Sequence, residues 1–102
     1  MTKFVYVYTG GTMAETPEEQ EKVMQEWGAW FGTLGSAVTD MGNPFSASAT
    51  VSPDGVADGG RSGAAGYSII TAGSLSEATT MAKGCPELNS GGVVEVYEAI
   101  DM

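Results

Sequence analysis

Two aspartates occupy positions that suit general acid–base chemistry. Asp40 ends a short apolar segment, and Asp58 lies in a glycine-rich stretch that can fold over a cleft. Proton transfer requires a group whose pKa lies near neutrality and which reaches the substrate, and burial raises the pKa of a carboxyl group. Both aspartates are therefore candidate catalytic bases. We prefer the simpler interpretation, in which Asp40 closes a strand and Asp58 forms a turn.

Three further residues are candidates for binding a ligand. Arg61 is the only arginine, and it stands among glycines whose backbone amides can approach a small carboxylate or phosphate ester. Tyr6 and Tyr67 fall on expected strands, where a hydroxyl can enter a cavity. The simpler interpretation makes Arg61 a solvated side chain and the tyrosines structural, because a buried tyrosine usually satisfies its hydroxyl within the fold.

Composition excludes several classes of site and partner. The chain has no histidine and a single cysteine, Cys85, so the usual ligands of zinc, copper and iron are missing. We expect no metal or other cofactor. Thirteen acidic residues against four scattered basic ones give a net charge of −9. Without a basic stripe, we expect no binding to nucleic acid or to an anionic membrane.

Length and hydropathy indicate one cytoplasmic domain. The 102 residues suffice for a single hydrophobic core, so we treat residues 1–102 as one domain. The N-terminal apolar run ends at Gly10 and Gly11 and lacks the form of a secretory signal. No stretch approaches the roughly 18 apolar residues of a spanning helix.

The first third of the chain predicts a strand followed by a helix. Residues 3–9 are almost all β-branched or aromatic, which is typical of a strand. Thr16-Pro17-Glu18-Glu19 predicts a helix start, with a hydroxyl cap, a proline at the first position and a glutamate three residues after the cap. Apolar side chains then recur at helical spacing and are assigned to the core: Val23, Met24, Trp27, Trp30, Phe31 and Leu34.

The middle of the chain predicts short extended segments and a loop. Residues 37–40 and 45–51 are extended pieces that lead to a turn at Pro53-Asp54-Gly55. We expect residues 54–66, which are rich in glycine and offer little to bury, to form a mobile loop.

The last third predicts strand, helix and strand. Residues 66–71 form the first of these strands and residues 93–98 the last. Ser74, with Glu77 three residues later, caps the helix between them. The expected buried side of that helix is Leu75, Ala78, Ala82 and Cys85.

This order predicts an α+β fold of the ferredoxin-like βαββαβ kind. The expected four-stranded antiparallel sheet carries both helices on one face, so its other face needs a cover. Phe4, Tyr6 and Tyr8 alternate along the first strand, and we expect them to point to that uncovered face. A second copy packed sheet to sheet would then form a homodimeric α+β barrel.

The chain resembles the YCII-related, or DGPF-domain, family along nearly its whole length. The resemblance rests on the order and spacing of an opening strand that ends Val-Tyr-Thr-Gly, the Thr-Pro-Glu-Glu helix start, Gly66-Tyr67-Ser68-Ile69-Ile70, Ser74-Leu75-Ser76-Glu77-Ala78, Ala82-Lys83-Gly84-Cys85-Pro86 and Val94-Glu95-Val96.

The resemblance implies a dimeric, ferredoxin-like α+β barrel, and most members of the family have no established activity. Some members are similar to dehydrochlorinases or lactone-processing enzymes that use a histidine–aspartate pair, which this chain cannot supply. It also departs from the namesake Asp-Gly-Pro-Phe stretch: Asp58-Gly59 is followed by Gly60-Arg61, and the acidic segment after it is shortened to Ser62-Gly63-Ala64-Ala65.

Three functional hypotheses follow. The first is a homodimeric domain that binds a small organic molecule in a cleft between the sheet, the helices and the 54–66 loop. The second is a histidine-independent isomerase or lyase that acts on a small organic acid through a carboxylate base. The third is a structural or regulatory module that acts through its surface.

Overall fold

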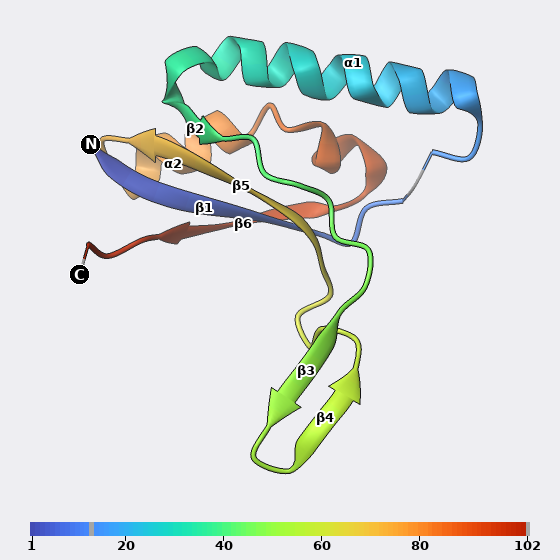
Figure 1. Ribbon diagram of the computed structural model, residues 1–102. Coiled ribbons are helices and arrows are strands. Elements are labelled where there is room, and N and C mark those ends of the chain that lie inside the picture. Colours follow the sequence, from blue (N-terminus) through green and yellow to red (C-terminus); the bar gives the residue numbers. More distant parts are fainter. Residues whose placement is uncertain (13, 102) are drawn as a thin grey trace.

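The computed structural model describes residues 1–12 and 14–101. Its main sheet is antiparallel, in the order β2-β5-β1-β6. These strands are β1 (Thr2–Thr9), β2 (Val38–Asp40), β5 (Ala64–Ala72) and β6 (Val93–Glu98). Helices α1 (Pro17–Leu34) and α2 (Leu75–Ala82) lie on one face of this sheet (Figure 1). The expected α+β fold, with a four-stranded antiparallel sheet and two helices, is confirmed.

Both helices begin where their caps predict. The hydroxyl of Thr16 accepts a hydrogen bond from the backbone N–H of Glu19 at 3.1 Å, and that of Ser74 accepts one from Glu77 at 3.1 Å. These bonds satisfy amides that the first helical turn leaves without partners. Helix α1 ends at Gly35, whose φ of 58° favours glycine. Two short 3₁₀ segments follow the helices, η1 (Gly35–Ala37) and η2 (Pro86–Ser90).

Phe4, Tyr6 and Tyr8 point toward the helices, so their expected place on the uncovered face is wrong. They are buried in one cluster with Trp30 of α1 and Ala78 of α2. The ring of Tyr6 stacks on Trp30 at 5.9 Å. The aromatic side chains therefore build the core between sheet and helices.

The two helices cover the sheet unevenly. The C-terminal half of α1 packs on the core through Trp27, Trp30, Phe31 and Leu34, as expected. Val23 and Met24 are exposed, so the core assignment fails for that turn of the helix. On α2, Ala78 and Ala82 are buried, but Leu75 is exposed.

Among the residues described, no helix has the length and apolarity needed to cross a membrane.

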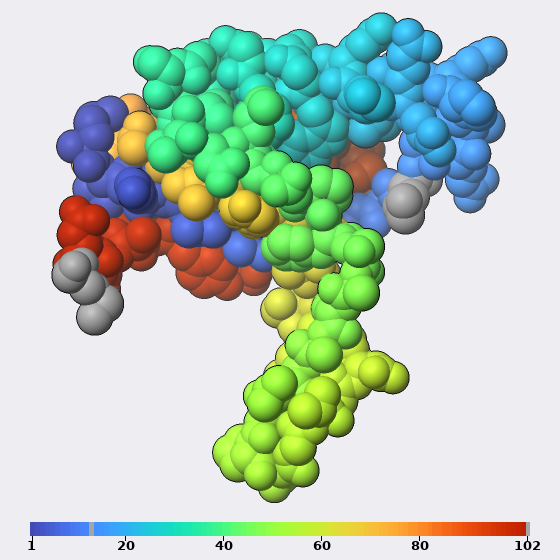
Figure 2. Space-filling view, viewed as in Figure 1, coloured from blue at the N-terminus to red at the C-terminus, as the bar shows by residue number. Residues whose placement is uncertain are grey.

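Residues expected to form a loop instead contain a strand. The strands β3 (Ala49–Ser52) and β4 (Gly55–Asp58) form a separate antiparallel hairpin, closed by the expected turn at Pro53 and Asp54. Figures 1 and 2 show it projecting from the body, on the side of the sheet opposite the helices. We call residues 46–63 the arm.

The helices leave one face of the main sheet uncovered, and we call it the open face. Strand register places Val5 opposite Ile69 and Tyr97, and Val7 opposite Tyr67 and Glu95. Because cross-strand partners share a face, the open face is defined by alternate residues of three strands. They are Lys3, Val5, Val7, Thr9, Tyr67, Ile69, Thr71, Val93, Glu95 and Tyr97.

Candidate functional site

The structure does not gather the predicted site residues around one cleft. Tyr6 is fully buried, and its hydroxyl donates a 2.6 Å hydrogen bond to the carbonyl oxygen of Ala78. Asp58 and Arg61 are exposed in the arm. Only Tyr67 and Asp40 come together, at the border of the open face. The expected cleft between sheet, helices and the 54–66 segment is therefore absent from the described chain, because residues 54–63 project away from the helices and residues 64–66 belong to β5.

Tyr67, Asp40 and Phe45 form a small cluster at the border of the open face. The Tyr67 hydroxyl lies 3.4 Å from Oδ2 of Asp40, and Oδ1 of Asp40 accepts a 2.8 Å hydrogen bond from the backbone N–H of Gly42. The ring of Phe45 stacks on that of Tyr67, with centroids 5.8 Å apart and planes inclined by 21°. The cluster combines a flat aromatic surface with an exposed carboxylate.

Backbone contacts with β5 position this cluster. The N–H of Phe45 donates to the carbonyl oxygen of Ala65 at 2.8 Å, and that of Tyr67 donates to Asn43 at 3.3 Å. Gly42 has a φ of 76°, and a Cβ there would overlap the carbonyl group of Tyr67. Only glycine permits this close approach. Residues 42–45 thus extend the edge of the sheet and carry Phe45 to the face of Tyr67.

A chain of buried hydroxyls crosses the sheet near the same strands but serves the fold. The Tyr8 hydroxyl donates to Oγ of Ser68 at 2.7 Å, and Ser68 donates to the carbonyl oxygen of Met41 at 2.6 Å. Burial raises the pKa of Tyr6 to about 12 and raises that of Tyr8 further. Both tyrosines are therefore neutral donors at physiological pH, and their hydroxyls are already bonded.

Two ionisable groups lie at the edge of the helix layer. Burial raises the pKa of the Cys85 thiol to about 12, so it is not a thiolate near neutrality. Burial also raises the pKa of Glu87, and a hydrogen bond from the backbone of Gly11 opposes the rise. On the open face, the charge of Glu95 raises the pKa of Tyr97. Tyr97 does not adjoin Tyr67 in strand register, because it lies opposite Val5. Cys85 and Glu87 lie outside the strands.

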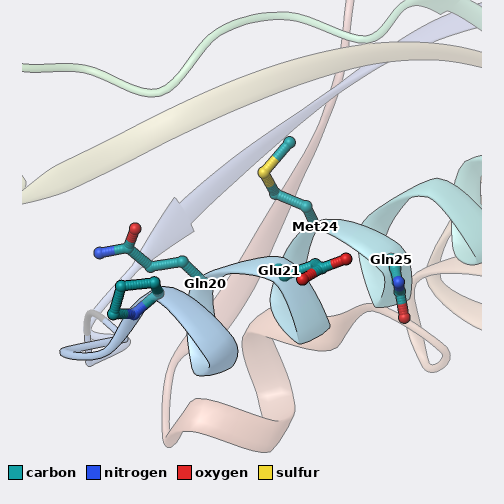
Figure 3. Close-up of a pocket in the computed structure, with 5 residues that line it drawn as sticks. Gln20, Glu21, Met24 and Gln25 are labelled. Atoms are coloured by element: carbon teal, nitrogen blue, oxygen red, sulfur yellow. The ribbon is translucent and has the colours of Figure 1, made fainter.

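Two hollows of the described surface are open to solvent. One follows the outer side of α1, lined by Pro17, Gln20, Glu21, Met24 and Gln25, and Figure 3 shows these side chains spread along the helix. The other, of about 510 Å³, lies between α1 and α2 and is lined by Trp30, Thr33, Leu34, Ala37, Glu77, Thr80, Met81 and Gly84. Within residues 1–12 and 14–101, no three acidic or cysteine side chains gather as a metal site.

The cluster offers one exposed carboxylate beside two stacked rings. Asp40 is exposed and accepts two hydrogen bonds, and the second predicted carboxylate, Asp58, lies away in β4. Stacked rings beside a carboxylate suit a flat molecule that carries a hydrogen-bond donor or a positive charge. A small organic acid would be repelled by Asp40.

Sequence reasoning found Tyr67 and Asp40 but missed Phe45. The signal was the Gly42-Asn43-Pro44 break, which interrupts the strand and leaves Phe45 free to turn back onto Tyr67.

A search against family models, curated proteins and solved structures found no match to this chain. The resemblance to the YCII-related family therefore stays a prediction.

Proposed function

We propose that the protein is a homodimeric, ferredoxin-like α+β barrel that binds a small flat molecule beside Tyr67. The observation that carries this proposal is the open face, whose centre is apolar and whose border holds a stacked aromatic pair and a carboxylate. Membership of the YCII-related family and a cytoplasmic location belong to the same proposal. The strand order β2-β5-β1-β6 supports the fold it names.

Apolarity and charge support a second copy as the cover of the open face. Val5, Val7 and Ile69 occupy its centre, and Lys3 partly offsets the acidic Glu95 and, at the border, Asp40. Six of the thirteen acidic residues lie instead on α1, α2 and η2, away from this face. For a chain of net charge −9, this face is the surface on which two copies approach with little repulsion.

A two-fold arrangement also brings like surfaces together. Identical apolar faces are complementary in polarity, and sheets that pack face to face lie about 10 Å apart. A molecule bound on Tyr67 would then lie at the margin of the paired sheets. Its ring would contact Phe45 and Tyr67, and its donor group would reach Asp40.

Sedimentation equilibrium tests the dimer. We expect the natural chain to be a dimer at micromolar concentration and Val7→Glu to be a folded monomer, because the substitution places a charge within the apolar pairing. The matched control is Val23→Glu, which adds the same charge on an exposed turn of α1 and should leave the dimer intact. A natural chain that sediments as a monomer at 100-fold higher concentration, about 100 µM against an ordinary affinity of about 1 µM, contradicts the proposal.

Binding is tested with a panel of aromatic amines and matched aromatic acids. We expect some amines, and none of the acids, to shift the amide resonances of residues 42–45 and Tyr67. Asp40→Asn should weaken that binding at least tenfold, whereas Asp54→Asn, the same change in the exposed turn of the arm, should not. Binding of the amines that is indifferent to Asp40→Asn would refute the site.

A further inference from the structure

The arm presents an apolar pair to water. Val51 of β3 lies directly opposite Val56 of β4, and the two side chains are 77% and 74% exposed. Such a pair contributes nothing to the core of its own chain. Ordinary hairpins of a folded domain bury one of their faces.

The shape of the arm is nevertheless fixed by hydrogen bonds within it. The Thr50 hydroxyl donates to the carbonyl oxygen of Gly59 at 2.7 Å and accepts from the backbone N–H of Arg61 at 3.0 Å. The hydroxyl of Ser48 accepts from the N–H of Gly60 at 2.8 Å. The base of the hairpin is thus tied on both strands, although an isolated two-stranded hairpin is marginally stable in water. An ordered hairpin with an unburied apolar pair indicates a contact outside the chain.

The direction of the arm identifies that contact. The arm projects past the open face, on the side away from α1 and α2 (Figure 1). The radius of gyration, 14.8 Å, exceeds the roughly 13 Å of a compact domain of this length, as the projection requires. Any body that covers the open face must therefore lie beside the arm.

An aromatic pair also lies between the open face and the start of the arm. Tyr67 belongs to the open face, and Phe45, which stacks on it, directly precedes the arm. A second copy seated on Val5, Val7 and Ile69 would thus meet Phe45 at its edge and the Val51–Val56 pair beyond it.

We propose that the two copies of the dimer exchange their arms, each arm packing Val51 and Val56 against the partner subunit. The inference rests on the dimer of the proposed function and adds an element to it that the open face does not require. It assigns a role to the hairpin that replaces the expected loop. In this arrangement, both margins of the paired sheets are closed by an arm from the other copy.

Neighbouring substitutions on opposite faces of the arm test this contact. Val56→Asp should raise the dimer dissociation constant about tenfold or more, because it places a charge in the packed contact. Ala57→Asp adds the same charge to the next residue, which is exposed on the other face of the hairpin, and should change the constant less than about threefold. Equal effects of the two variants, or none, would overturn the exchange.

Hydrogen exchange separates the arm from the dimer itself. The amides of β3 and β4 should exchange at least tenfold more slowly in the natural dimer than in monomeric Val7→Glu, while β1 and β5 stay protected in both. If the natural chain sediments as a dimer but its arm amides exchange at the same rate as in Val7→Glu, whether fast in both or slow in both, the exchanged arm is refuted and the dimer still stands. A natural chain that sediments as a monomer refutes both proposals.

Discussion

The two faces of the main sheet carry tyrosines in opposite states. On the covered face, Tyr6 and Tyr8 are buried, and their hydroxyls donate to Ala78 and Ser68. On the open face, Tyr67 is half-buried and Tyr97 is exposed. The strands are apolar on both sides, so the difference comes from the helices. Their aromatic residues pack on one face to form the core and leave the other face uncovered.

The largest expected difference between the faces is the cost of removing a tyrosine ring. Tyr6→Ala should lower the free energy of unfolding by about 3–5 kcal/mol, because it leaves a cavity against Trp30. Tyr67→Ala should lower it by about 1 kcal/mol, chiefly through the lost stack on Phe45. Both are measured by urea unfolding in the Val7→Glu background, which removes the proposed pairing. Equal costs would mean that the two faces are covered alike in the single chain.

A smaller difference is expected for the hydroxyls alone. Tyr8→Phe removes the donor to Ser68 and should lower the free energy of unfolding by about 1–2 kcal/mol. Tyr97→Phe, the same change on the open face, should stay within about 0.5 kcal/mol of the natural chain. Chemical unfolding at one pH measures both. A cost for Tyr97→Phe as large as that for Tyr8→Phe would contradict the contrast.

The smallest effect concerns Glu87 and depends on pH. Burial raises its pKa in the folded chain above the ordinary 4.5, so folding favours the protonated carboxyl. That stability is fully present below pH 4.5 and is lost as pH rises through the folded pKa. Glu87→Gln should therefore be more stable than the natural chain at pH 7, and this gain should fade in acid.

The exposed residue Glu21 provides the control for this pH dependence. Glu21→Gln makes the same charge change on the outer side of α1 and should show no comparable gain. Unfolding curves at pH 7 and pH 4 compare the two variants. A gain for Glu87→Gln that is the same at both values would place its origin outside the titration of Glu87.

Local signals in the sequence predicted the elements better than their faces. Thr16 and Ser74 defined the helix starts because each cap needs only the next three residues. The first strand, by contrast, alternates aromatic Phe4 and Tyr6 with apolar Val5 and Val7. Period-two alternation separates two faces but cannot say which one the helices cover when both are apolar.

The arm and the Tyr67 cluster depended on contacts that the sequence does not encode locally. β4 is Gly-Val-Ala-Asp, a short segment with little to mark it as a strand, and its pairing with β3 comes from the turn between them. Asp40 meets Tyr67 because β2 pairs with β5 through an irregular register. That meeting spans 27 residues and follows from tertiary packing.

The placement of the chain's single thiol has a consequence for kinetics. Cys85 is buried where α2 gives way to η2, beneath the layer that covers the sheet. A thiol reagent in solution can reach the Cys85 thiol only when the helices separate from the sheet. The rate at which the reagent labels the native protein therefore measures how often the helices open, independently of the open face and the arm.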